Sequence, residues 1–65
     1  MVFEIGDLVR VRHMSQHSLG VVTAVDLGDE YVKPRAKILM FNGRIYQFMA
    51  DDLELKSKGD NHESV

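Results

Sequence analysis

The feature that most constrains this chain is an Asn-Gly pair, Asn42-Gly43, set between two apolar runs, AKILMF at 36–41 and RIYQFM at 44–49. Two short runs separated by Asn-Gly favour a β-hairpin. A type I′ turn needs positive φ at both central residues, which glycine adopts freely and asparagine tolerates. The sequence therefore predicts a hairpin with a two-residue turn.

A two-residue turn also fixes which side chains share a face, with Phe41 opposite Arg44 and Leu39 opposite Tyr46. One predicted face carries no charge and consists of Ala36, Ile38, Met40, Ile45, Gln47 and Met49. The other consists of Lys37, Leu39, Phe41, Arg44, Tyr46 and Phe48. Because buried unpaired charge is costly, we expect the first face in the core and the second toward solvent. Gln47 argues against this assignment, because a buried amide needs hydrogen-bond partners.

The second face supplies the candidate interaction patch: Lys37, Leu39, Phe41, Arg44, Tyr46 and Phe48. A contiguous apolar surface with a polar rim often marks an interface. The alternative is that the loop at 26–35 or the termini cover half of these side chains, with Phe3, Ile5 or Tyr31 as the cover. The sequence leaves both interpretations open.

The remaining apolar segments are also extended. Val9 and Val11 alternate with Arg10 and Arg12, a period of two that is typical of a half-buried strand. The segment 20–25, GVVTAV, is rich in β-branched residues, and 53–55, LEL, is a last short run. We predict one all-β domain over residues 1–55, followed by a flexible polar tail at 56–65.

Size and composition limit the functions that are open to the chain. It has 65 residues, no cysteine and a formal charge of −2. A domain of this size buries only ~60% of the surface of its unfolded chain, and no disulfide or thiolate metal site can compensate. No apolar run approaches the ~18 residues of a membrane span. We expect a complete, soluble, cytoplasmic protein without membrane attachment.

Several segments together resemble a known family. FEIGDLVRV, LGVVTAV, AKILMFNGRIYQF and ADDLEL are similar to the successive strands of small SH3-like barrels of the KOW and Tudor kind, with MADD at 49–52 as the closing turn. The resemblance covers about residues 3–55. It implies a small five-stranded SH3-like, partly open barrel with a disordered C-terminal tail. The chain also looks like short stand-alone barrel proteins of tailed phages and marine bacteria, which would imply action in the host cytoplasm or the virion.

Catalytic and metal-binding patterns are weak. His13 and His17 have the spacing of two ligands on a helix, but the residues between them favour a loop. Asp51, Asp52 and Glu54 are explained more simply as a turn cap and a solvated surface. There is no glycine-rich phosphate loop and no nucleophile elbow, and we expect no room for a pocket of ~300 Å³. The sequence therefore predicts no enzyme, metal or cofactor.

Two binding functions remain. The leading prediction is a protein-interaction or assembly module that uses the hairpin patch or a strand edge, with a homodimer as a specific version. The alternative is binding of RNA or another single-stranded nucleic acid, and its candidate contacts are Arg10, Arg12, Arg44 and Tyr46. Acids outnumber bases by 10 to 8, which speaks against this alternative.

Overall fold

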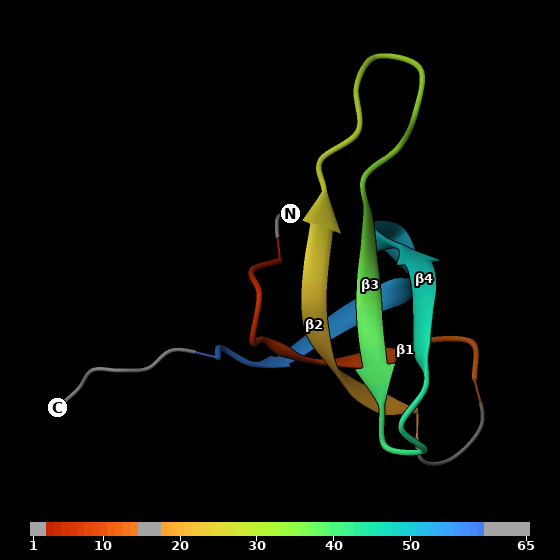
Figure 1. Ribbon diagram of the computed structural model, residues 1–65. Coiled ribbons are helices and arrows are strands. Elements are labelled where there is room, and N and C mark those ends of the chain that lie inside the picture. The colour runs from red at the N-terminus through yellow and green to blue at the C-terminus, as the bar shows by residue number, and fades with distance from the viewer. Residues whose placement is uncertain (1–2, 15–17, 60–65) are drawn as a thin grey trace, which may run out of the picture.

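The computed structural model describes residues 3–14 and 18–59 and shows an all-β domain with five antiparallel strands in a single sheet (Figure 1). The elements are β1 (Leu8–Val11), β2 (Leu19–Asp26), β3 (Arg35–Met40), β4 (Ile45–Met49), the 3₁₀ turn η1 (Ala50–Asp52) and β5 (Leu53–Ser57). The strand order is β4-β3-β2-β1-β5, so β4 and β5 are the two edges and the sheet is not closed. The predicted five-stranded, partly open all-β arrangement is confirmed, and the predicted closing turn at 49–52 contains η1.

The first two strands follow their side-chain patterns. Val9 and Val11 are buried and Arg10 is exposed, as the alternation in β1 predicts. β2 is longer, and its pairing with β3 shifts between Val22 and Ala24. This irregularity leaves Thr23 without a direct partner residue, and its hydroxyl donates a hydrogen bond to the Lys37 carbonyl at 3.1 Å. Such a bulge bends the strand and increases its twist, which helps a single sheet curl around its own core.

The core lies on the concave side of this curled sheet. Its buried hydrophobic residues are Phe3, Val9, Val11, Val22, Ala36, Ile38, Met40 and Leu53. The predicted burial of Ala36, Ile38 and Met40 on β3 is therefore confirmed. Gly20 sits opposite Met40, where a Cβ would collide with the Ile38 side chain and lie 2.8 Å from the Leu39 carbonyl oxygen. The glycine therefore keeps space for the buried β3 side chains.

The predicted two-residue turn is wrong, because the loop has three residues. Met40 N–H donates to the Arg44 carbonyl at 2.8 Å, and Gly43 N–H donates to the Met40 carbonyl at 2.9 Å. Gly43 has a φ of +86°, and the Asn42 Oδ1 accepts a hydrogen bond from Arg44 N–H at 2.9 Å. This is a turn followed by a glycine bulge, in which the asparagine contributes its side chain rather than a left-handed backbone.

The extra loop residue shifts the register by one and reverses the faces of β4. Leu39 pairs with Ile45, Ile38 with Tyr46, and Ala36 with Phe48. Tyr46 and Phe48 therefore share the core side with Ile38, and Phe48 packs partly buried against the core. Ile45, Gln47 and Met49, which were expected inside, are exposed. This correction also resolves the difficulty with Gln47, because its amide lies in solvent and needs no buried partner.

Replacing Gly43 with alanine is expected to lower the free energy of unfolding by about 1 kcal/mol, because the left-handed conformation is costly for a residue with a Cβ. A Cβ at this position meets no described atom within 4 Å, so backbone strain is the main effect. Gly43→Asn should cost less, since asparagine tolerates this conformation. Urea denaturation followed by circular dichroism measures both variants. Equal stability of Gly43→Ala and the wild type would contradict the bulge.

A buried aspartate links the two ends of the described chain. The Asp7 carboxylate, only 1% exposed, accepts hydrogen bonds from Glu4 N–H at 2.9 Å, Gly59 N–H at 3.0 Å and the Lys58 ammonium at 3.2 Å. β5 extends to Ser57, and the chain remains in contact with Asp7 as far as Gly59. The domain therefore extends beyond the predicted boundary at residue 55. The rest of the predicted tail, 60–65, lies outside the described residues.

The β2–β3 connection projects away from the sheet as an arm (Figure 1). The Asp29 Oδ1 accepts hydrogen bonds from Tyr31 N–H at 2.8 Å and Val32 N–H at 2.9 Å, which organise the tip. Tyr31 is 86% exposed, and Ile5 is also exposed, whereas Phe3 belongs to the core. Tyr31 and Ile5 therefore do not cover the hairpin, and the cover considered from the sequence is wrong for both.

Candidate interaction surface

The structure divides the six predicted patch residues between two faces. Lys37 and Leu39 lie on the outer face of the sheet, opposite Gln47 and Ile45. Tyr46 and Phe48 lie on the opposite face, in register with Ile38 and Ala36. Phe41 is the first residue of the three-residue loop, Arg44 follows the loop, and both are exposed. The one-residue shift in register is the physical reason that the patch is not a single surface.

The aromatic part of the patch does assemble, in a surface groove of about 530 Å³. The groove is lined mainly by apolar atoms of Met14, Met40, Phe41, Asn42, Tyr46 and Phe48. The Tyr46 and Phe48 ring centroids are 6.3 Å apart with the planes tilted by 51°. This spacing is within the usual range for interacting aromatic pairs. Met14 and Met40 were not predicted to lie here. For Met40 the reason is the type I′ register, which placed it on the other face from Tyr46.

The backbone of β4 is available along the free edge of the sheet. Met40 N–H bonds to the Arg44 carbonyl at one end of the hairpin, and Ala50 N–H bonds to the Pro34 carbonyl at the other. Hydrogen-bonded pairs in an antiparallel ladder recur at every second residue. Tyr46 and Phe48 therefore direct their backbone groups to β3. The N–H and C=O groups of Ile45, Gln47 and Met49 point outward, where the described residues form no further strand of the sheet.

The two edges of the sheet are unlike in charge. β4 reads IYQFM and carries no charged residue. β5 reads LELKS, with Glu54 and Lys56, and its pairing with β1 is broken by an irregularity near Leu8. Charges and bulges are the usual devices that stop a free edge from pairing with another chain. β5 has both and β4 has neither.

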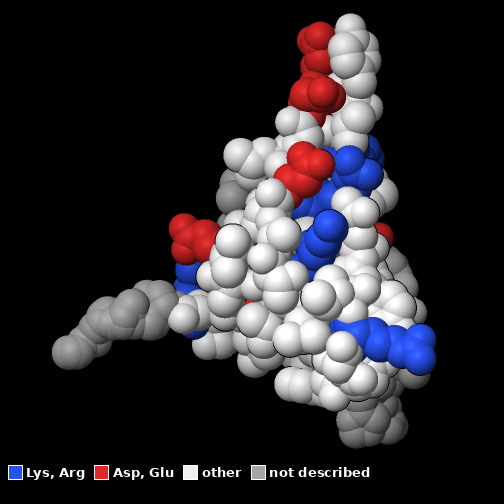
Figure 2. All heavy atoms as spheres, in the orientation of Figure 1, with Lys and Arg blue, Asp and Glu red and all other residues white. Residues whose placement is uncertain are grey.

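The side chains of β4 add apolar surface on both sides of that edge. On the outer face Ile45 is 57% exposed, and its register partners Leu39, Val21 and Leu8 form an aliphatic row across four strands. On the groove face Tyr46 is 40% exposed. Figure 2 shows acids over the arm, near its base and at the sides of the visible face, while the part toward the β3–β4 turn shows neutral and basic side chains.

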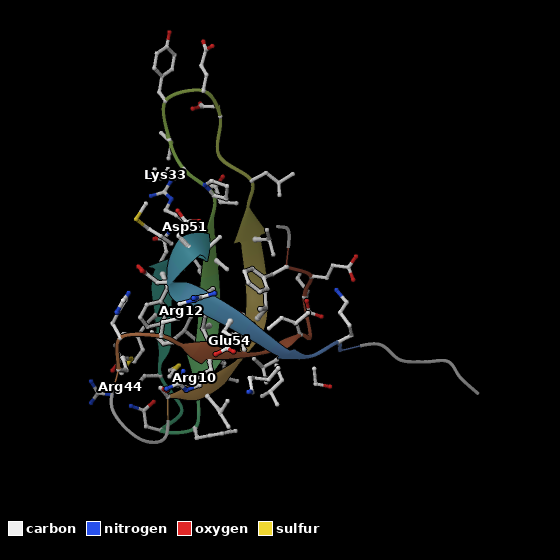
Figure 3. All side chains as sticks on the ribbon, turned by 180° about the vertical axis from the view of Figure 1, so that it is seen from behind. Arg10, Arg12, Lys33, Arg44, Asp51 and Glu54 are labelled. Atoms are coloured by element: carbon white, nitrogen blue, oxygen red, sulfur yellow. The ribbon has the colours of Figure 1, made fainter. Side chains whose placement is uncertain are left out.

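The candidate nucleic-acid contacts are only partly brought together. Arg10 is held by Glu54, with the guanidinium Nη1 3.4 Å from the carboxylate Oε1, and Figure 3 shows the two side by side. Within the part of the chain that the structure describes, the Arg12 and Arg44 side chains have no hydrogen-bond or ion-pair partner. Arg44 and Tyr46 belong to the same end of the hairpin, whereas Arg10 and Arg12 lie at β1. The four residues do not form one continuous basic stripe.

The other polar clusters are small. His13 Nε2 lies 3.5 Å from Asp52 Oδ1, and Lys33 Nζ lies 4.0 Å from Asp51 Oδ2. Among residues 3–14 and 18–59, no three His, Cys, Asp or Glu side chains gather as a metal site would require. His17 falls outside the described residues. The expectation of no pocket near 300 Å³ is wrong, since a second hollow of about 410 Å³ lies between β2, β3 and β4.

No helix in the described part of the chain is long and apolar enough to cross a bilayer. Comparison with known proteins found no matching family model, no matching curated protein and no matching solved structure. The relationship to KOW and Tudor barrels therefore stays a prediction that rests on the sequence segments.

Proposed function

We propose that this protein is a non-enzymatic interaction module that binds an extended polypeptide segment along the free edge of β4. The observation that carries the proposal is an uncharged edge strand whose backbone groups at Ile45, Gln47 and Met49 point away from the sheet. A strand added there would satisfy these groups by the same ladder that joins β3 and β4. Main-chain hydrogen bonds supply the affinity in this mode of recognition.

The groove gives this mode of binding a basis for selectivity. Residues of the incoming segment that face Tyr46 and Phe48 would direct their side chains to the groove side of the sheet. Residues that face Ile45 and Met49 would lie over the outer aliphatic row. Because side chains alternate along a strand, we expect a preferred segment to carry apolar residues at alternating positions. The cytoplasm stays the predicted place of action.

The proposal is tested by selecting a displayed library of random heptapeptides on the immobilised protein. Enriched peptides should share alternating apolar residues and shift the amide resonances of Ile45, Gln47 and Met49. Gln47→Pro should weaken their binding about tenfold or more, because proline removes an outward N–H without taking a bond from the β3–β4 ladder. Gln47→Ala is the matched control, since it keeps the N–H and should retain binding. Equal binding by Gln47→Pro and Gln47→Ala would contradict strand addition.

A second candidate, single-stranded nucleic-acid binding, is favoured by the exposed Tyr46 ring and by Arg44, whose side chain has no partner among residues 3–14 and 18–59. Aromatic rings next to cations suit stacking with phosphate contact. The pairing of Arg10 with Glu54 removes part of the required basic surface. Titration of labelled poly-U in low salt separates the two functions. Binding that is lost in Arg44→Ala but retained in Gln47→Pro would favour nucleic acid.

A further inference from the structure

We infer that the segment which occupies the β4 edge is β4 of a second copy of this chain, paired antiparallel about a two-fold axis at Gln47. This inference rests on the proposed function and identifies its partner. The result would be a continuous sheet in which the two β4 strands lie side by side at the centre. A two-fold interface needs a surface that is complementary to itself, and β4 meets this requirement in its backbone and in its side chains.

The backbone requirement selects one register. Outward-facing groups occur at Ile45, Gln47 and Met49, which are evenly spaced about Gln47. Centring the axis there pairs Gln47 with Gln47 of the second copy, and Ile45 with Met49 in both directions. Each such pair exchanges two hydrogen bonds, so this register forms about six. A shift by two residues in either direction leaves one outward residue of each copy unpaired and forms about four.

The side chains are compatible with the same register. Two-fold symmetry places a central residue opposite itself, so a central charge would repel its own copy. The central residue is Gln47, whose amide carries both a donor and an acceptor and can therefore pair with an identical amide. Ile45 would cover Met49 of the second copy on the outer face, and Tyr46 would face Phe48 of the second copy on the groove face. No position of β4 introduces a charge.

The exposed surface and the thin core also favour self-association. Ile45, Tyr46 and Met49 are each at least 39% exposed in the single chain, and pairing would cover part of this surface. The formal charge of −2 gives little repulsion between copies. Two five-residue strands bury less than the ~1,600 Å² of a standard interface, so we expect a dimer that dissociates on dilution. Its formation would add stability by mass action.

The test is a single cysteine at the proposed axis. The chain has no cysteine of its own, so Gln47→Cys can form a disulfide only between copies. Residues of a hydrogen-bonded antiparallel pair have Cα atoms ~5.5 Å apart, which matches disulfide geometry. On mild oxidation Gln47→Cys should crosslink about tenfold faster than Lys37→Cys, because pairing raises the effective thiol concentration. Lys37 is the matched control, since it is exposed on the neighbouring strand and faces Gln47.

A charge-swap experiment provides an independent readout. Gln47→Lys and Gln47→Glu should each be monomeric by light scattering, and an equimolar mixture should contain the dimer. Equal crosslinking of Gln47→Cys and Lys37→Cys, or a mixture that stays monomeric, would overturn the inference. If the displayed peptides still bind β4 in that case, the proposed function stands and only its partner is wrong. If the peptides also fail to bind, both are overturned.

Discussion

Asp7→Ala is expected to lower the free energy of unfolding by about 3 kcal/mol, since breaking a buried, hydrogen-bonded charge network typically costs ~3–5 kcal/mol. The substitution removes the carboxylate that accepts hydrogen bonds from the Glu4 and Gly59 N–H groups. It also releases the Lys58 ammonium, which still has Glu4 at 3.2 Å and is half-exposed, so this contact contributes less. A domain of this size has only ~3–5 kcal/mol in total, so most of the stability would be lost.

The same carboxylate gives the stability a defined pH dependence. Burial raises the pKa of Asp7, but hydrogen bonds from Glu4 N–H, Gly59 N–H and Lys58 outweigh it and hold the pKa below the ordinary 3.8. The contribution of Asp7 is therefore complete above pH 3.8 and is lost as the pH falls through the lower value of the folded protein. In Asp7→Asn, this part of the decrease in the free energy of unfolding at acid pH should be absent.

Urea denaturation at pH 7 and at a series of acid pH values measures both effects. Asp51→Ala is the control, because Asp51 is exposed and its ion pair with Lys33 spans 4.0 Å. We expect a change within about 0.5 kcal/mol for this variant. An Asp7→Ala protein as stable as Asp51→Ala would show that the link between the chain ends contributes nothing.

Ile38→Ala is expected to lower the free energy of unfolding by about 3–4 kcal/mol, within the range of ~2–5 kcal/mol for truncating a buried aliphatic side chain to alanine. Ile38 is completely buried on β3, between Val22 and Tyr46 in neighbouring strands. Leu39→Ala, one position along the same strand, should cost about 1 kcal/mol or less because Leu39 faces the outer side and is partly exposed.

The contrast between these neighbours tests the face assignment of β3. If Ile38→Ala does not fold, Ile38→Val remains measurable, with an expected cost of about 1 kcal/mol. Larger destabilisation by Leu39→Ala than by Ile38→Ala would mean that the faces are reversed.

Alternation was sufficient to predict the strands and most of the core. Val9, Val11, Ile38 and Met40 are buried as their spacing indicates, because one face of a small curled sheet must exclude water. The burial of Asp7 was not predictable, since its partners Lys58 and Gly59 are more than fifty residues away and look like part of a polar tail. From its neighbours in the sequence, Asp7 looks like an ordinary turn residue after Gly6.

The interaction surface was predicted less well, and the reason is local. Asn-Gly is compatible both with a two-residue turn and with a three-residue loop that ends in a glycine bulge. The three-residue loop forms here, and it is stabilised by the hydrogen bond that the Asn42 Oδ1 accepts from Arg44 N–H. Phe41, Tyr46 and Phe48 still come together in the groove, but Met40 joins them in place of Leu39. The unprotected β4 edge was readable in principle, since IYQFM has no charge whereas LELKS has two.

The bulge at Gly43 also acts as a spacer that decides what the molecule displays. With three residues in the loop, Ile45, Gln47 and Met49 are shown to the surroundings. A loop shorter by one would rotate the alternation of β4 and exchange these side chains for the aromatic rings. A single-residue insertion or deletion at this turn would thus remodel the recognition properties of the protein in one genetic step while leaving every strand residue in place.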